Sequence, residues 1–177
     1  MEYNLRRAQE ALGRENVSVL MTTTKESLAY PREIIDEYLR LNLGSIVLRS
    51  LSPFGFATKT MKAIGYSSEE FVEFYKKALD YILELNRQGH SFAEGFATLL
   101  LTKILTPFPN GYVDLQSPAG AGFSAVAYNY DGEVYASDEA RMLAEMNDTS
   151  FRLGNVLDNS YEQIFFGERM QAIAAAS

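Results

Sequence analysis

Apolar and polar positions in the first half of the chain alternate between patterns typical of strands and of helices. Residues 17–23 (VSVLMTT) and 45–51 (SIVLRSL) are rich in β-branched and apolar residues, which predicts two buried strands. Between them, Pro31 is typical of the first turn of a helix, and Gly44 is suited to the left-handed end of that helix. Together with the helix that follows, residues 16–88 predict the order strand, helix, strand, helix, which is the order of parallel βα units.

The helix after the second predicted strand has the strongest local signals. Ser67 and Glu70 have the spacing of a capping box, and Gly89 is suited to end the helix. The apolar face between them consists of Phe71, Phe74, Tyr75, Ala78, Leu79, Ile82 and Leu85. Two further helices are predicted, a short one over residues 4–12 and a longer one over residues 92–105.

Two parallel strands leave two open sheet edges. An open edge presents unpaired N–H and C=O groups, and a parallel sheet is normally covered on both faces. We therefore predict that another chain or a second copy completes the sheet, or that the strands are part of a larger α/β barrel. A mixed sheet that includes strands from residues 112–128 is the alternative.

Beyond residue 110 the pattern changes to that of a β-hairpin. Residues 123–128 and 133–136 are strand-like, and Asp131-Gly132 lies between them. This pair favours a type I′ turn, whose two central residues have positive φ.

Two helices are predicted after the hairpin. Ser137 is suited to cap the first, whose first turn carries two carboxylates. Ser160 and Gln163 have the spacing of a second capping box. The helix that they begin is predicted to run towards Ala175.

Composition and charge narrow the classes of partner. The 177-residue chain has 47% hydrophobic and 22% charged residues, which is typical of a globular protein. With 16 Lys and Arg against 23 Asp and Glu, its net charge is −7, which argues against binding to nucleic acid or to an acidic membrane. No apolar stretch approaches the ~20 residues of a membrane span, and no secretory signal opens the sequence. We therefore expect a protein of the cytoplasm.

The chain contains no cysteine and one histidine. It therefore has no thiolate for a disulfide, for thiol catalysis or for an iron–sulfur cluster, and no Cys–His set for zinc. His90 follows Gly89 at a predicted helix end, where we expect a solvated or capping side chain rather than a metal ligand. We predict no metal site in this chain.

Polar side chains lie at the predicted carboxyl ends of both parallel strands. Thr22, Thr23 and Thr24 end the first strand, and Arg49 and Ser50 end the second. Ligands of α/β barrels bind at this edge, so these five residues are candidates for facing a substrate or cofactor. The alternative is that they only end the strands.

A long connection follows the second strand. Residues 52–66, with Pro53, Gly55 and Gly65, are predicted to form a loop of about fifteen residues, which is long for a βα connection. Loops of this length often carry function, so we expect a functional role here.

Asp138, Glu139 and Arg141 form a second candidate group. Two carboxylates beside a guanidinium are able to orient a polar substrate. The alternative is that the carboxylates stabilise the start of a helix while Arg141 pairs locally. Adjacent carboxylates on one turn do not face each other across a site as glycosidase chemistry requires, and a single histidine at a helix end does not favour a Ser–His hydrolase.

Five segments of the chain together resemble the sequence of one protein family. They are residues 22–27 (TTTKES), 50–55 (SLSPFG), 117–122 (SPAGAG), 128–135 (YNYDGEVY) and 137–143 (SDEARML). Together they resemble the radical SAM peptide maturases with a SPASM-type C-terminal extension, in particular the maturase of the His-Xaa-Ser system. The resemblance covers most of this chain and corresponds to the middle of such a protein.

The resemblance implies a fold, cofactors and a substrate. It implies a partial radical SAM-like barrel over residues 1–110 and a SPASM-like hairpin and helix extension over residues 111–177. In the family, a Cys-x3-Cys-x2-Cys loop holds the 4Fe-4S cluster that reduces S-adenosylmethionine, and further cysteines hold auxiliary clusters. This chain has neither set, so no cluster ligand carries over. The candidates at the strand ends would face the ribose, the methionine or the peptide substrate.

The sequence therefore predicts an α/β fold, a partial (β/α) barrel of parallel strands with a small β-hairpin plus helix extension. The predicted function is that of a fragment of a maturase that modifies a ribosomally made peptide. It is expected to be inactive alone, and no catalytic residue is assigned. The alternative is a non-catalytic module that binds a peptide or associates with itself. The expected partners are a precursor peptide and a second copy or another completing chain.

Overall fold

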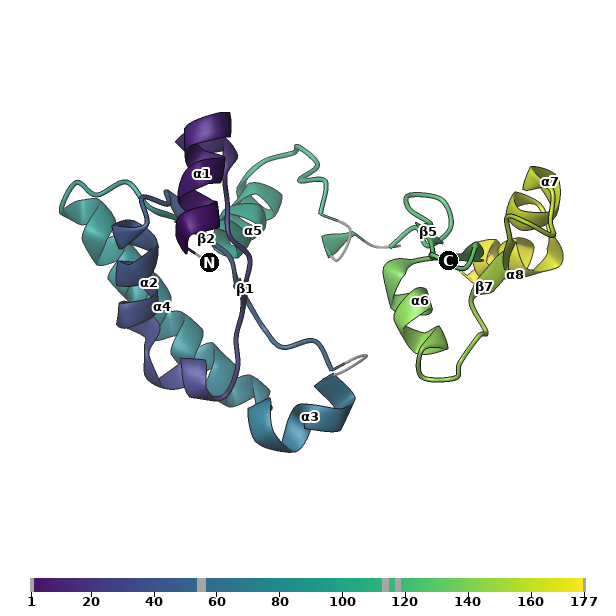
Figure 1. Cartoon of the computed structure of the whole chain (residues 1–177), viewed down its shortest axis with the longest axis horizontal. Coiled ribbons are helices and arrows are strands. Elements are labelled where there is room, and N and C mark those ends of the chain that lie inside the picture. Colours follow the sequence, from purple (N-terminus) through teal and green to yellow (C-terminus); the bar gives the residue numbers. More distant parts are fainter. Residues whose placement is uncertain (1, 54–56, 113–114, 117–118, 177) are drawn as a thin grey trace. The chain divides into compact units, whose positions relative to one another are not determined.

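Two compact units make up the computed structural model, which describes residues 2–53, 57–112, 115–116 and 119–176. The first unit consists of Met1–Pro53 and Lys59–Asn110, and the second of Phe54–Thr58 and Gly111–Ser177 (Figure 1). Parts of three segments discussed above, 50–55, 52–66 and 117–122, lie outside the described residues.

The elements up to residue 110 alternate between strands and helices. In chain order they are α1 (Glu2–Leu12), the 3-10 turn η1 (Arg14–Asn16), β1 (Met21–Thr22), the 3-10 turn η2 (Glu26–Ala29), α2 (Pro31–Arg40), β2 (Ser45–Ile46), β3 (Leu48–Arg49), α3 (Ala57–Ile64), α4 (Ser68–Arg87), β4 (Ala93–Glu94) and α5 (Gly95–Leu105). The predicted order strand, helix, strand, helix is present. Within the described ranges, none of the helices of either unit is long and apolar enough to cross a bilayer.

The strands of the first unit are short and parallel. β1 pairs with β3, and β2 pairs with β4. The Arg49 N–H donates to the Val47 carbonyl at 3.1 Å, and this local turn interrupts the segment between β2 and β3. The strands are therefore shorter than the predicted ranges 17–23 and 45–51. The described residues form an α/β unit with parallel strand pairs, and no closed barrel is present among them.

The predicted helix over residues 92–105 begins later than expected, at Gly95, because β4 precedes it. The Asn86 side chain donates to the Phe92 carbonyl at 2.7 Å and accepts from the Phe92 N–H at 3.0 Å. These two bonds hold the backbone of Phe92 against the end of α4, so its groups do not join a helix. The prediction of a helix start at Phe92 is wrong for this reason.

Local signals at the other helix ends give mixed results. The capping box of α4 is confirmed, because Ser67 Oγ accepts from the Glu70 N–H at 3.2 Å and the Glu70 carboxylate accepts from the Ser67 N–H at 2.7 Å. Gly89 has a φ of 92° and ends α4 as predicted. The prediction that Gly44 forms the left-handed end of α2 is wrong. Asn42 adopts the left-handed conformation with a φ of 61°, since asparagine tolerates it better than most residues.

The segment predicted as a loop over residues 52–66 contains a helix, α3. Its eight residues, ATKTMKAI, include several helix-favouring side chains. The Lys25 N–H donates to the Ile64 carbonyl at 2.9 Å, which ties the end of α3 to the segment after β1. The prediction of an irregular connection is therefore wrong over Ala57–Ile64.

The core of the first unit lies between its strands and the pair α2 and α4, which pack against each other (Figure 1). Its buried residues are Ile35, Tyr38, Leu43, Ile46, Leu48, Phe74, Ala78, Ile82, Leu85 and Phe92. Four of the α4 positions, Phe74, Ala78, Ile82 and Leu85, belong to the apolar face that the sequence predicts. Helical periodicity therefore identified the face of α4 that contacts the core.

The second unit is built on a three-stranded antiparallel sheet in the order β5-β6-β7. Its elements are β5 (Ala127–Tyr128), β6 (Glu133–Tyr135), α6 (Asp138–Ala144), β7 (Arg152–Asn155), α7 (Tyr161–Phe165) and α8 (Glu168–Ala176). Its core consists of Val134, Ala136, Leu153, Ile164 and Met170. The hairpin β5-β6 is confirmed, whereas β7 has no counterpart in the sequence prediction.

The turn of the hairpin differs from the predicted type. The Gly132 N–H donates to the Asn129 carbonyl at 3.0 Å, and the Asn129 N–H donates to the Glu133 carbonyl at 2.8 Å. Gly132 has a φ of 83°, but Asp131 does not have a positive φ. A type I′ turn requires positive φ at both central residues, so that prediction is wrong. The Asp131 carboxylate instead accepts the Glu133 N–H at 3.1 Å.

The last predicted helix is divided in two. Ser160 and Gln163 form the predicted capping box, with bonds of 2.9 and 3.3 Å. The helix ends at Phe165, and α8 begins after Gly167. A Cβ atom at Gly167 would lie 2.2 Å from the Gln163 carbonyl, so the chain bends there more closely than a side chain allows. The prediction of one continuous helix towards Ala175 is therefore wrong.

Candidate functional site

The structure brings the first candidate group to one end of one strand pair. Because β1 and β3 are parallel, with Thr22 opposite Arg49, their carboxyl ends lie at the same edge. Thr22, Arg49 and Ser50 are exposed there, Thr24 is half-buried and Thr23 is buried. The three threonines and the Arg49-Ser50 pair, two groups more than twenty residues apart in the sequence, therefore occupy one small region of the first unit.

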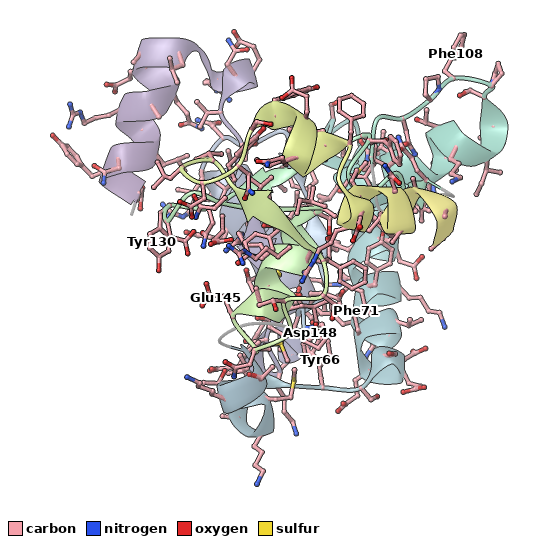
Figure 2. The ribbon with its side chains drawn as sticks, turned by 90° about the vertical axis from the view of Figure 1, so that its right-hand side faces the viewer. Tyr66, Phe71, Phe108, Tyr130, Glu145 and Asp148 are labelled. Carbon is pink, nitrogen blue, oxygen red and sulfur yellow. The ribbon has the colours of Figure 1, made fainter. Side chains whose placement is uncertain are left out.

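Tyr66, which the sequence analysis did not select, joins the two strand ends. Its hydroxyl accepts from the Leu51 N–H at 2.6 Å and donates to the Thr23 carbonyl at 3.3 Å. Its ring stacks on Phe71 with centroids 5.9 Å apart and an interplanar angle of 14° (Figure 2). Burial raises the pKa of Tyr66, so the hydroxyl keeps its proton at neutral pH. Tyr66 therefore fixes the spacing of the strand ends.

Thr23 carries a buried hydroxyl that has no hydrogen-bond partner within the part of the chain that the structure describes. Its residue is fully buried, and its backbone groups are used by the Arg49 carbonyl and the Tyr66 hydroxyl. The Oγ1 atom has no partner among the described atoms. Most buried polar groups are paired, so an unpaired hydroxyl at a strand end is a candidate contact for a ligand.

Thr24 supports the alternative that strand-end hydroxyls have a local structural role. Its N–H donates to Ser27 Oγ at 3.2 Å, and the two hydroxyl oxygens are 3.1 Å apart. These bonds close the turn that leads into η2. The geometry therefore separates Thr24, whose hydroxyl is engaged, from Thr23, whose hydroxyl is not.

Glu94 is the most buried charged side chain of the first unit and was also not selected from the sequence. It is 3% exposed. Its carboxylate accepts from the Leu48 N–H at 3.0 Å, the Ala97 N–H at 2.5 Å and the Tyr75 hydroxyl at 2.5 Å. Burial and this last bond raise the pKa of Tyr75 above its usual range. Glu94 therefore ties β3, α4 and the start of α5 together.

The second candidate group lies in the second unit, at the start of α6. The Arg141 guanidinium donates to Asp138 Oδ1 through Nε at 3.0 Å and Nη2 at 2.8 Å. Asp138 and Glu139 lie exposed in the first turn, and Ser137 Oγ accepts the Ala140 N–H at 3.1 Å. This arrangement matches the local alternative, in which the carboxylates stabilise a helix start and Arg141 pairs one turn away.

A polar network in the second unit centres on Asn155. The Asn155 amide donates to the Asp131 carbonyl at 3.1 Å and to Glu133 Oε1 at 3.0 Å. Arg152 also donates to both oxygens of Glu133, from Nη2 to Oε1 at 2.6 Å and from Nε to Oε2. Burial raises the pKa of Glu133, but the bonds from Arg152 and Asn155 outweigh it, so the net pKa lies below its usual value. The network joins the hairpin turn to β7.

An iron–sulfur cluster does not fit this chain. Cluster irons are held by thiolates, and the sequence contains no cysteine. Within the part of the chain that the structure describes, no group of three or more His, Asp or Glu side chains is arranged to hold a metal ion. His90 is exposed at the end of α4, as predicted, and its N–H donates to the Leu85 carbonyl at 3.0 Å.

Comparison with solved structures identifies proteins of similar fold. The enzyme anSMEcpe, an anaerobic sulfatase-maturating radical SAM enzyme, matches with a TM-score of 0.59 and 16% identity when it carries AdoMet and the Kp18Cys peptide. Its form with AdoMet alone matches with a TM-score of 0.59 and 17% identity. Each match covers 94% of this chain and 44% of the other, so this chain spans less than half the length of that enzyme.

The level of identity limits this likeness to the fold. At 16–17% identity, the matches indicate that both units share the fold of part of a radical SAM enzyme. No family model matches the sequence. No curated protein matches it either.

Proposed function

We propose that this chain is a portion of a radical SAM-type maturase that modifies a ribosomally made peptide, of the kind found in the His-Xaa-Ser system. In this proposal residues 1–110 are part of a (β/α) barrel, and residues 111–177 form a SPASM-like extension. The observation that carries it is the fold likeness over 94% of the chain to an enzyme with AdoMet and a peptide bound. A chain without disulfide-forming residues suits the reducing cytoplasm, which is the proposed location.

The chain does not start the radical reaction in this proposal. It has no thiolate to hold the cluster that reduces S-adenosylmethionine, so a Cys-x3-Cys-x2-Cys segment must be supplied by another part of the machinery. What this chain supplies is a surface that faces the substrate. The isolated chain is therefore proposed to bind without catalysis.

The strand-end group is the proposed binding surface. Arg49 and Ser50 are exposed and offer a cation and a hydroxyl, whereas the unpaired hydroxyl of Thr23 is buried at the same strand end. A guanidinium binds carboxylates and carbonyl oxygens through several donors, which suits a peptide backbone or an acidic side chain. In the second unit, Arg141 pairs with Asp138 at the start of α6, so Asp138, Glu139 and Arg141 are not assigned to this surface.

A non-catalytic peptide-binding module is the second candidate. Among the described residues, β1 to β4 form two separate two-stranded sheets, β1-β3 and β2-β4, which leaves one side of each strand without a ladder partner. An extended peptide binds such an edge by adding a strand. The two proposed functions differ in the groups that contact the peptide. Strand addition uses backbone groups of an edge strand, whereas the surface at the strand ends uses side chains.

Selection of binders from a randomised peptide display library tests the proposal. We expect the selection to yield peptides that bind the intact chain. Arg49→Glu should lower their affinity roughly tenfold or more, which is a loss of about 1.4 kcal/mol or more of binding free energy. Arg87→Glu, at the exposed end of α4, is the matched control and should leave binding unchanged. Calorimetric titration of each variant with the selected peptides measures the effect.

Thr23→Val refines this test, because it keeps the shape of the side chain and removes only the hydroxyl. Removal of an unpaired buried hydroxyl is expected to raise the free energy of unfolding by about 1 kcal/mol. Weaker peptide binding together with this higher stability would assign the hydroxyl to the ligand. Peptides that bind all three variants equally would contradict the strand-end surface and favour strand addition.

A further inference from the structure

The connection into the second unit contains an Asn-Gly pair. Asn110 is the last residue of the first unit, and Gly111 opens the main segment of the second. Residues 109–112 form neither a helix nor a strand. Of the asparagines in the sequence, Asn110 alone precedes a glycine. Glycine has no side chain, so its backbone nitrogen can approach the side chain of the preceding residue without steric hindrance.

The backbone nitrogen of Gly111 is accessible. Gly111 is exposed, and its N–H donates no hydrogen bond within the described part of the chain. A Cβ atom at Gly111 would meet no heavy atom within 4 Å apart from its two neighbours in the chain, so this side of the peptide faces open space. The Asn110 amide donates to the Leu99 carbonyl at 3.5 Å, which is longer than a usual hydrogen bond. This bond holds the amide group and not the Gly111 nitrogen, so the nitrogen stays open to reaction.

We propose that Asn110 is a site of spontaneous deamidation. Hydroxide removes the proton from the Gly111 nitrogen, which then forms a bond to Cγ of Asn110. The two atoms belong to adjacent residues, so the attack is intramolecular, which favours ring closure. The bond between Cγ and Nδ2 breaks, Nδ2 takes a proton from water and leaves as ammonia, and a cyclic succinimide remains. Water then opens the ring at either carbonyl and yields aspartate or isoaspartate.

A second pair that is able to form a succinimide, Asp131-Gly132, is protected by the hairpin turn. The Gly132 N–H donates to the Asn129 carbonyl at 3.0 Å, and the Asp131 carboxylate accepts the Glu133 N–H at 3.1 Å. A Cβ atom at Gly132 would lie 2.9 Å from Asn155 Oδ1, so this pair is also crowded. Ring closure would have to break both hydrogen bonds. The folded chain is therefore expected to react at the connection and not in the hairpin.

Deamidation changes both the charge and the backbone of the connection. Each event replaces a neutral amide with a carboxylate, which adds one negative charge to the −7 of the parent chain. The new carboxylate has no proton to donate to the Leu99 carbonyl, so the segment loses this bond to α5. Isoaspartate also places its Cβ atom in the main chain, which lengthens the connection between residues 110 and 111. This inference does not depend on the proposed function.

Incubation of the intact chain in mildly alkaline buffer, followed by peptide mapping with mass spectrometry, tests the inference. We expect aspartate and isoaspartate at residue 110, formed faster as the pH rises, because hydroxide takes part in the reaction. Asn110→Gln should lower the rate of deamidation at this position roughly tenfold or more, since the longer side chain closes a larger and less favoured ring. Labelling by an isoaspartyl methyltransferase detects the isoaspartate independently.

Asn4→Gln is the matched control. Asn4 is exposed but precedes Leu5, so this variant should deamidate at Asn110 at the rate of the parent chain. The urea-unfolded chain should in addition isomerise at Asp131, because the bonds of the turn are then absent. The inference is overturned if Asn110 stays intact in the folded chain, whether or not the unfolded chain reacts there. Isomerisation of Asp131 at equal rates in the folded and unfolded chains would overturn the protection by the hairpin turn.

Discussion

Glu94→Ala is expected to lower the free energy of unfolding by about 3 to 5 kcal/mol. The substitution removes the acceptor for three donors at once, the N–H groups of Leu48 and Ala97 and the hydroxyl of Tyr75. Since Glu94 is 3% exposed, water does not readily replace the lost carboxylate. A loss of this size is a large fraction of the stability of a typical domain. Urea unfolding followed by circular dichroism measures it.

Two matched variants separate the contributions to this effect. Glu94→Gln keeps one acceptor oxygen and the shape of the side chain, so its loss should be smaller. Tyr75→Phe removes a single hydroxyl and should lower the stability by about 1 to 2 kcal/mol. Hydrogen exchange analysed by mass spectrometry should place the increased exchange of Glu94→Ala in β3, α4 and α5. A loss below about 1 kcal/mol for Glu94→Ala would contradict the central position of this carboxylate.

Asn155→Asp is expected to destabilise the second unit by about 3 kcal/mol or more at pH 7. The change replaces an amide donor, 3.0 Å from Glu133 Oε1, with a carboxylate oxygen of the same charge as Glu133. It also removes the donor to the Asp131 carbonyl. Because Asn155 is 7% exposed, the repulsion is only partly screened by water.

The pH dependence of this variant follows from the pKa of Glu133. In the parent chain this pKa is lowered by Arg152 and Asn155, so the carboxylate stabilises the fold above its unfolded pKa and loses this effect as the pH falls through the folded value. In Asn155→Asp, two adjacent carboxylates raise the pKa of at least one of them, so protonation relieves the repulsion at acid pH. The difference in stability between parent and variant should therefore shrink between pH 7 and pH 4.

A double substitution provides the control for the pH experiment. Glu133→Gln with Asn155→Asp removes the like-charge contact but keeps the shape of both side chains. At pH 7 the double variant should lose less free energy of unfolding than the two single variants lose in sum. The difference is a favourable coupling energy, which should decrease towards pH 4. Additive effects at both pH values would contradict the close contact between Glu133 and Asn155.

The sequence predicted those features of the helices that depend only on residues close together in the chain. Both capping boxes, the left-handed Gly89 and the buried face of α4 are local features, and the structure contains them. β4 was missed because it has two residues and its position is fixed by Asn86, a side chain from the preceding helix. The break at Gly167 likewise reflects a close backbone approach that periodicity does not reveal.

The candidate site was predictable in position but not in detail. Polar residues at the ends of parallel strands meet at one edge, and the structure places Thr22 opposite Arg49 and joins the Thr23 N–H to the Arg49 carbonyl at 3.3 Å. Tyr66 and Glu94 were missed because their importance comes from hydrogen bonds to backbone groups distant in sequence, such as the Leu51 and Leu48 N–H groups. The one signal in the sequence for Glu94 was its position as a carboxylate among the otherwise uncharged residues 92–102.

Anaerobic reconstitution with iron and sulfide, followed by gel filtration and iron analysis, tests the central claim most directly. The claim is that a chain with the fold of part of a radical SAM enzyme has no donor set for its cluster. We predict that the protein fraction carries no bound iron, shows no visible cluster absorbance and does not cleave S-adenosylmethionine with a reductant present. Recovery of a tightly bound iron–sulfur cluster on the purified chain, or cleavage of S-adenosylmethionine by the chain alone, would contradict the account.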